Sequence, residues 1–376
     1  MSSPSMTSNI VSSVVAEVIE PAATTVDRDG VYPRAALDAL GKAGLLGLVS
    51  ATEVGGLGGT LRDAAEAVEL VGRACGSTGM VLCMHYCATA ALEQHGPRAV
   101  REAIARGEHV TTLAFSEMGS RSHFWAPIST ATAAGEGQVR LDAQKSWSTS
   151  GGEATSYVWS SKPLAAEGMS SLWLVPSDAH GLSTVKPFDG MGLRGNASCP
   201  IKATGVMVPE SALLGEDGGG LDIMMVIVLP YFQVLSSACY LGITEAATAK
   251  SVAHVSATKL AHIGQSLADL PTIRAYLARM RLKTDMMRGL LRDTLTALEE
   301  SQEVAQLRVL EVKAAAAETA TEVTELAMRV CGGAAFRKEV GIERHFRDAR
   351  AATVMSPTTD LLYDFIGKAI TGMPLL

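Results

Sequence analysis

The spacing of the hydrophobic residues changes twice along the chain, and this change constrains the fold more than any other feature. From residue 9 to about 107, apolar residues such as Val11, Val14 and Val18 recur at helical spacing, which predicts amphipathic helices. From about 109 to 215, short runs rich in Val, Thr, Trp and Ser alternate with Gly and Pro, which predicts strands. After residue 220 the helical spacing returns in long stretches, at 221–255, 271–298 and 301–331.

The order helices, strands, helices predicts an α+β fold that is mainly α. We expect an N-terminal helical domain at 1–110, a middle antiparallel β-domain at 111–215 and a C-terminal four-helix bundle at 216–376. The composition agrees, because 47% of the residues are hydrophobic and only 5% are aromatic, a mixture that favours packed helices. The segment 53–60 is too rich in glycine to continue a helix.

Charge and composition exclude several classes of function. The net charge of −7 leaves no basic surface for nucleic acid. The N-terminus lacks the pattern of a signal peptide, and the apolar run at 223–229 is too short to span a bilayer, so we expect a cytoplasmic protein. The six cysteines are scattered without a CxxC pair, which favours small buried thiols and no metal site.

Three segments, taken together, resemble the acyl-CoA dehydrogenase family. They are AFSE followed by KSWSTSGG (114–117 and 145–152), GMGLRGNASCPIKATGVMVPESALLGE (190–216) and RVCGGAAFRKEVGIERHFRDAR (329–350). Their order and spacing match the family over nearly the whole chain, and the third segment is the most specific. The resemblance implies the three-part fold predicted above, with FAD bound between the β-domain and the C-terminal bundle.

The resemblance implies a set of residues around the flavin ring. Ser116 and Thr149 would hydrogen-bond the isoalloxazine, and Trp147 would pack against it. A reduced flavin gains charge near N1 and N5, and fixed donors stabilise that charge without reorganising. Matching positions add three further cofactor-binding residues, which are Leu113, Thr358 and Asp360.

The resemblance also implies an assembly of subunits. Gly332 and Gly333 would allow close approach to the adenine dinucleotide of a neighbouring subunit, so we expect a homodimer or homotetramer. Arg329 replaces a glutamine of the family, and an arginine there suits the pyrophosphate. A charge network is expected to position this loop, formed by Glu343, Arg344, Arg347 and Asp348.

The chain departs from the family at the general base. Ser356 stands where common members carry the glutamate that abstracts the α-proton, and Phe232 stands where other members take the base from a bundle helix. A serine hydroxyl cannot replace a carboxylate unless another base activates it. The catalytic residue therefore stays open, with His123 and Asp360 as candidates; His85, His262 and His345 are expected to be structural.

The substrate-binding residues also differ from the family pattern. Ser122 stands where a family serine meets the acyl thioester, and Gln233 replaces a family arginine. The first interpretation is a flavin oxidoreductase that acts on an acyl thioester of CoA or a carrier protein, with an electron acceptor as partner. The alternatives are a monooxygenase of the same fold, supplied with reduced flavin (FMN included) by a reductase, and a catalytically inactive paralogue.

Overall fold

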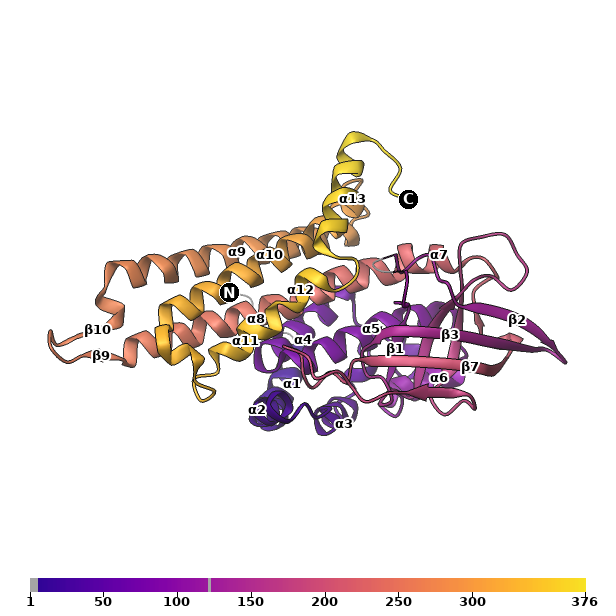
Figure 1. The fold of residues 1–376 in the computed structure, drawn as a ribbon, viewed down its shortest axis with the longest axis horizontal. Helices are drawn as coiled ribbons and strands as arrows, with labels where there is room; N and C mark the ends of the chain where they lie inside the picture. Colours follow the sequence, from indigo (N-terminus) through magenta and orange to yellow (C-terminus); the bar gives the residue numbers. More distant parts are fainter. Residues whose placement is uncertain (1–5, 121–122) are drawn as a thin grey trace.

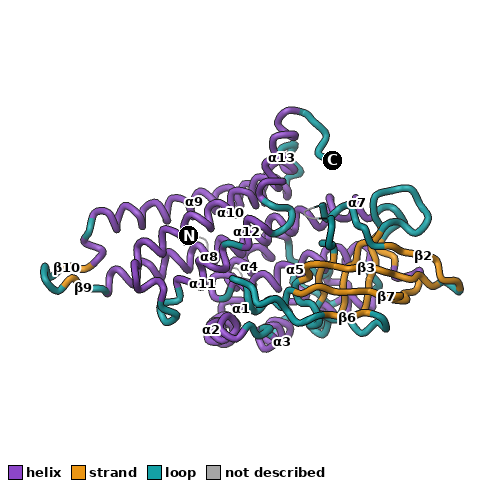
Figure 2. The backbone as a smooth tube through the Cα atoms, viewed as in Figure 1, coloured by secondary structure: helices purple, strands orange, loops and turns teal. Residues whose placement is uncertain are grey.

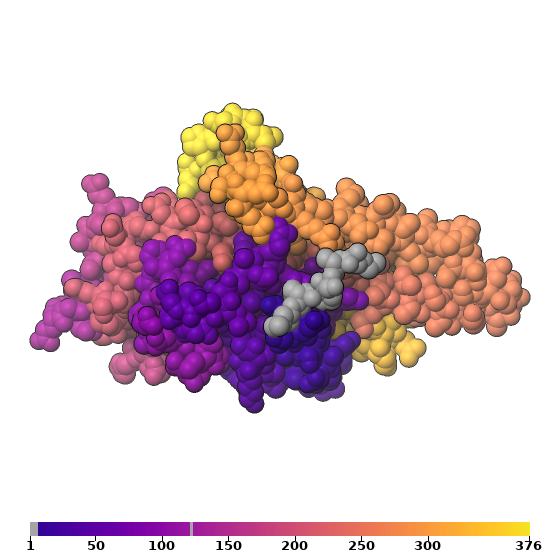
Figure 3. Space-filling model, turned by 180° about the vertical axis from the view of Figure 1, so that it is seen from behind, coloured from indigo at the N-terminus to yellow at the C-terminus, as the bar shows by residue number. Residues whose placement is uncertain are grey.

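The computed structural model describes residues 6–120 and 123–376, which form three packed parts in the order helices, strands, helices (Figure 1). The long C-terminal helices run along the molecule, with the strands of the β-domain at one end and the short hairpin at 259–266 at the other (Figure 2). Seen from behind, the N-terminal helices cover part of one face of the C-terminal ones (Figure 3). The predicted three-part, mainly helical fold is confirmed.

The first part consists of helices around α5, which is buried on nearly all sides. Their bounds are α1 Met6–Val14, α2 Glu20–Asp29, α3 Arg34–Lys42, α4 Leu61–Ala74, α5 Gly76–His95 and α6 Arg98–Ala105, with a π-helical turn Val15–Ile19 between α1 and α2. The glycine-rich segment 53–60 interrupts the helices, as predicted. Thr60 then starts α4 with a capping box, in which Thr60 and Asp63 each accept the other's backbone N–H.

The β-domain consists of two sheets. The strands are β1 Thr111–Ala114, β2 Thr130–Gly135, β3 Gln138–Ser148, β4 Ser156–Ser161, β5 Ser171–Pro176, β6 Leu182–Thr184, β7 Cys199–Pro209 and β8 Leu213–Leu214. One sheet has the order β1-β4-β5-β8 and the other β2-β3-β7-β6. The described pairs are antiparallel, as predicted, except that β1 and β4 are parallel. The reason is that the chain between them crosses to the second sheet and returns in the original direction.

The core of the β-domain lies between these sheets. Trp159 of β4 is paired with Trp173 of β5, and both side chains are fully buried. The central strands β3 and β7 alternate buried and exposed residues along much of their length, as expected for strands with one face toward a core. The domain therefore offers a rigid support for the turns at its edge.

The third part is built from long helices. Their bounds are α7 Gly220–Ile223, α8 Leu229–Ala257, α9 Pro271–Glu299, α10 Ala305–Cys331, α11 Ile342–Ala349, α12 Ala351–Val354 and α13 Thr359–Thr371. A short hairpin, β9 Lys259–Leu260 and β10 Gln265–Ser266, connects α8 to α9. Helices α8, α9 and α10 pack against one another, and α13 packs on α10.

The longest helix includes the apolar run at 223–229 and extends far beyond it. A π-helical turn, Met224–Val228, joins α7 to α8, so the helix is continuous from Gly220 to Ala257. By length and composition alone this helix could cross a membrane, whereas the run at 223–229 considered by itself could not. In the structure 72% of its most apolar window is buried inside the protein, where α4, α5 and α10 surround it.

Candidate active site

The turns after β1 and β3 bring the predicted flavin-contacting residues together. The backbone N–H of Ser146 donates to the carbonyl of Ser116 at 2.9 Å, so Ser116 lies beside Trp147. The side chain of Trp147 is 59% exposed, and its ring lies 4.0 Å from that of Phe188 at an interplanar angle of 33°. An aromatic pair left open on the surface is typical of a place that a ligand covers.

The turn that follows β3 is held in place by the connection between α2 and α3. Thr149 is buried, and the hydroxyl of Tyr32 donates to Ser150 at 2.9 Å. The hydroxyl of Ser148 is buried and has no hydrogen-bond partner within the described residues. These hydroxyl groups, with Leu113 buried in β1, fit a flavin ring, which offers both donors and acceptors along its edge.

A buried ion pair joins β3 to the segment that follows β1. Lys145 Nζ lies 2.5 Å from Glu117 Oε1 and donates to the backbone carbonyl of Ser160 at 2.7 Å. Burial alone would raise the pKa of Glu117, but the charge of Lys145 and hydrogen bonds from Lys145 and Ser129 lower it instead. Both residues belong to the motifs 114–117 and 145–152, but no local pattern predicts that they pair.

The turn that carries His123 packs beside the last helix. His123 is exposed, and its ring meets the edge of Trp125 at 5.1 Å; the Trp125 ring in turn lies 5.5 Å from Phe365 of α13. Ser122, the predicted thioester contact, lies outside the described residues. His123 is thus accessible in a turn adjoining α13, and its catalytic role stays a prediction.

The two positions at which the resemblance predicts a base lie close to one buried lysine. Ser356 lies between α12 and α13, and Phe232 lies in α8. Lys313 of α10 donates to the carbonyls of Met355 at 2.9 Å and Pro357 at 2.6 Å, and its Nζ lies 6.0 Å from the Phe232 ring. Burial lowers the pKa of Lys313 to about 7. Sequence reasoning missed this residue, although its neighbours at helical spacing (Val309, Leu310, Ala316 and Ala317) are all apolar.

Three other predicted residues lie near Ser356 or Phe232 in the chain. Thr358 caps α13, where its hydroxyl accepts from the backbone N–H of Leu361. Asp360 is exposed in the first turn of the same helix. Gln233 follows Phe232 in α8, and its side chain is 0% exposed. Neither the oxygen nor the nitrogen of its amide has a hydrogen-bond partner in the described part of the chain.

The glycine loop (residues 332–336) lies apart from the tryptophan turn, which comprises the end of β3 and the turn after it, residues 147–152. Gly332 and Gly333 belong to a 3₁₀ turn, Gly332–Phe336, that ends α10, and both glycines are exposed. Figure 1 shows that α10 runs away from the β-domain toward the opposite end of the molecule. Arg329 is also exposed, and its guanidinium lies 3.8 Å from Glu325. The two predicted halves of the FAD site are therefore far apart within one chain.

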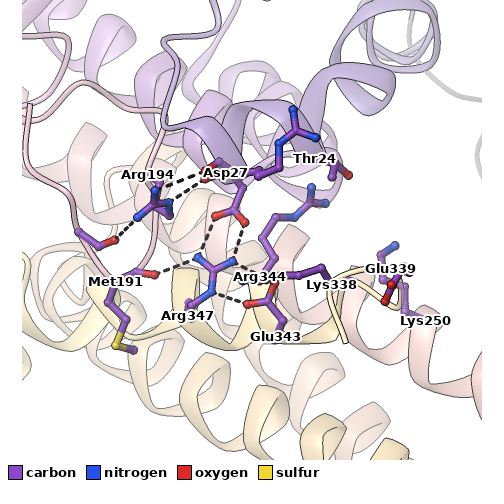
Figure 4. Close-up of a pocket in the computed structure, with 13 residues that line it drawn as sticks. Thr24, Asp27, Met191, Arg194, Lys250, Lys338, Glu339, Glu343, Arg344 and Arg347 are labelled. Atoms are coloured by element: carbon purple, nitrogen blue, oxygen red, sulfur yellow. Dashed lines mark hydrogen bonds and ion pairs between the residues drawn. The ribbon is translucent and has the colours of Figure 1, made fainter. Parts of the chain in front are cut away.

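A charge network joins the N-terminal helices to α11. The guanidinium of Arg347 binds the carboxylates of Asp27 and Glu343 (Figure 4). Asp348 accepts the backbone N–H of Leu193 at 2.6 Å. A cavity of about 410 Å³ lies between α2, the loop at 190–194 and α11. The network therefore spans all three parts of the chain. Its role in positioning the glycine loop stays a prediction.

The remaining histidines considered as bases, and the cysteines, are not among the residues predicted to contact the flavin. His85 is fully buried between the carbonyl of Leu46 and the backbone N–H of Thr111, and burial lowers its pKa to about 4. His345 is buried and its pKa is also lowered, first by burial and then by nearby cations, whereas His262 is exposed on the loop after α8. The six cysteines are buried and free. In the described ranges no group of three or more His, Cys, Asp or Glu side chains could hold a metal ion.

Comparison with known proteins identifies the class. Three domain models match almost the whole chain: acyl-CoA dehydrogenase N-terminal domain at 4–107, middle domain at 112–206 and C-terminal domain at 218–371. The human mitochondrial short-chain specific acyl-CoA dehydrogenase is 29% identical over 350 residues, which cover 91% of this chain and 83% of that protein.

Solved structures show the same fold. Butyryl-CoA dehydrogenase from Megasphaera elsdenii has a TM-score of 0.90 at 22% identity, with 97% of each chain covered. The prolyl acyl carrier protein oxidase AnaB has a TM-score of 0.88 at 19% identity, with 98% of this chain and 100% of that chain covered.

Fold and relatives together define a flavin-dependent oxidoreductase. The chain belongs to the acyl-CoA dehydrogenase family. Its cofactor is FAD.

Proposed function

We propose that the enzyme acts on a small acyl thioester, carried by CoA or by a carrier protein, without the usual carboxylate base. One observation carries the proposal: the tryptophan turn is exposed as a flavin site requires, whereas the two family base positions hold Ser356 and Phe232 around a buried lysine. When bound, the flavin would exchange electrons with the substrate. A reaction that begins by removing an α-proton needs a positioned base, and this chain offers none at the familiar places.

The chain's own residues would bind and orient the two ligands. Ser116 and Thr149 would donate hydrogen bonds to the flavin, and Trp147 with Phe188 would exclude water from it. The buried amide of Gln233 favours a substrate with a polar substituent. Each amide group left without a hydrogen bond costs about 1–3 kcal/mol of free energy. A ligand oxygen or N–H would remove that cost, whereas an unsubstituted alkyl chain would not.

The second candidate is a monooxygenase that takes reduced flavin, FAD or FMN, from a partner reductase. The observation that favours it is again the lack of a carboxylate at Ser356 and Phe232, since oxygenation by a reduced flavin does not require an α-proton to be removed. FMN lacks the adenine half of FAD, so FMN would leave the Gly332–Gly333 loop without a role in cofactor binding.

One experiment separates these proposals. The purified protein is analysed for its flavin, and reoxidation of the reduced flavin by O2 is followed with and without butyryl- and octanoyl-CoA. Reduction of the oxidised flavin by a thioester supports the first proposal. Oxygen-dependent product formation from supplied reduced flavin supports the monooxygenase. Flavin binding with neither activity, across polar and carrier-bound thioesters, would indicate an inactive paralogue and contradict both.

Assembly belongs to the same proposal. We propose a homodimer or homotetramer in which the Gly332–Gly333 loop and Arg329 contact the adenine dinucleotide of a neighbouring subunit. The exposure of this loop supports the proposal, because a Cβ added at either glycine would meet no described atom within 4 Å. A partner's cofactor therefore has room to approach the backbone there.

A further inference from the structure

Lys313 is the unusual polar residue in the centre of the C-terminal part. Its side chain is 0% exposed, and no acidic side chain in the described ranges forms an ion pair with it. Three backbone carbonyls accept its hydrogen bonds instead: Ala352 at 3.3 Å, Met355 at 2.9 Å and Pro357 at 2.6 Å. An ammonium group has three N–H donors, so the three carbonyls match its full capacity.

Retaining an ammonium group here is expensive. A buried charge loses its hydration, and apolar residues of similar volume often stabilise a protein as well or better. The surroundings are otherwise apolar, with the Phe232 ring on the α8 side. Stability of the helix bundle therefore gives no reason for a lysine at this position, and the reason lies in the segment that the lysine binds.

The segment that Lys313 binds comprises residues 352–357. The three carbonyls lie on both sides of Ser356, the position of the family's base, and the segment leads directly into Thr358 and Asp360, two predicted flavin contacts. Thr358 also starts α13, so the direction of that helix follows from the conformation of the segment. Lys313 thus ties the segment to α10 by hydrogen bonds, in addition to the packing of α12 and α13 on α10.

We propose that Lys313 is a positioning residue, which holds segment 352–357 against α10 and thereby sets where Ser356 and Thr358 stand relative to flavin and substrate. The proposal rests on the proposed function, because it assigns the segment to the flavin and acyl site. It does not make Lys313 a catalytic residue, since its donors are all used by backbone carbonyls. Removing the ammonium should release the segment while the rest of the bundle stays folded.

The test compares Lys313→Met, Lys313→Arg and the control Lys283→Met in the FAD-loaded full-length protein. Lys283 lies on α9 and pairs at the surface with Glu322 at 2.9 Å. Amide hydrogen exchange is measured at residues 352–358, and the flavin spectrum is titrated with butyryl-CoA as a probe. We expect Lys313→Met to exchange at least about tenfold faster in this segment alone and to bind the probe about tenfold more weakly. Lys313→Arg should restore both properties in part, and Lys283→Met should change neither.

Other outcomes would overturn the inference. Unchanged exchange in segment 352–358 of Lys313→Met would show that the lysine does not hold the segment. Faster exchange throughout the chain would show a role in stability only. Should Lys313→Met fail to fold, Lys313→Gln, which keeps amide donors, is measured in the same way. The proposed function fails separately, when the unmodified protein binds neither FAD nor a thioester; the exchange of segment 352–358 is then compared between the unmodified protein and Lys313→Met without FAD.

Discussion

Lys145 and Glu117 form an ion pair at 2.5 Å whose side chains are 0% and 3% exposed, and this pair joins the end of β1 to β3 beneath the tryptophan turn. Glu117 also accepts the backbone N–H groups of Ile128 and Ser129. The pair therefore fixes the spacing of the turns that carry Ser116 and Trp147. Removing one partner would leave the other charge buried and unpaired.

Lys145→Met should lower the free energy of unfolding by about 3–5 kcal/mol, because an uncompensated carboxylate would remain buried. The control is Arg140→Met on the same strand, because Arg140 is 54% exposed in its ion pair with the half-buried Asp142; the expected loss there is below about 1 kcal/mol. Urea denaturation measures both values. Equal losses in the two variants would contradict the assignment of a special role to the buried pair.

Trp147→Ala combined with Thr149→Ala should reduce the flavin content of the purified protein. The physical reason is the loss of the exposed aromatic face and of a nearby hydroxyl donor. The flavin-to-protein absorbance ratio reports the change. Met207→Ala, at an exposed position on β7, is the matched control and should keep full flavin content. Normal flavin binding by the double variant would remove this turn from the cofactor site.

Ser356→Glu should increase the rate at which a thioester bleaches the oxidised flavin. Supplying a positioned base typically raises a rate by about 10²–10⁴-fold. Stopped-flow absorbance with butyryl- and octanoyl-CoA measures the rate, and Ser356→Ala is the control that adds no base. Rapid bleaching by the unmodified enzyme would reveal another base, and His123→Gln and Asp360→Asn would then identify it.

Light scattering at micromolar concentration should give the mass of a dimer or tetramer. Gly332 has φ 55° and ψ −140°, a conformation that glycine adopts far more readily than other residues. Gly332→Ala should therefore distort the loop and weaken FAD retention without a clash inside its own chain. A strict monomer that retains FAD would contradict the shared cofactor site.

Glu245 makes the stability depend on pH. Burial would raise its pKa, but hydrogen bonds and charge from Arg281 and Arg288 lower it to about 2. Because the folded pKa lies below the unfolded value of about 4.5, the stabilisation is complete above that pH and is lost as the pH falls toward 2. Glu245→Gln should cost about 1–2 kcal/mol at pH 7, allowing for the partial exposure of Arg281. Thermal unfolding at pH 7 and pH 3 tests this, and the variant should differ less from the unmodified protein at pH 3.

Much of the architecture could be predicted from local pattern. The strands around Trp159 and Trp173 and the helices after residue 220 lie where the spacing of apolar residues placed them, because the two periods of 2 and 3.6 follow from backbone geometry alone. The parallel pairing of β1 with β4 was missed, since pairing depends on which sheet the intervening strands join.

The sequence by itself determined the family and the cofactor, because these follow from residue identity within motifs. The absence of a carboxylate base at Ser356 stays a prediction. Only the tertiary structure decided which side chain holds the segment around Ser356. Lys313 lies 43 residues before Ser356 in the chain, and it meets segment 352–357 only because α10 packs against it. Burial and three-way hydrogen bonding are properties of that packing, and no local pattern of residues records them.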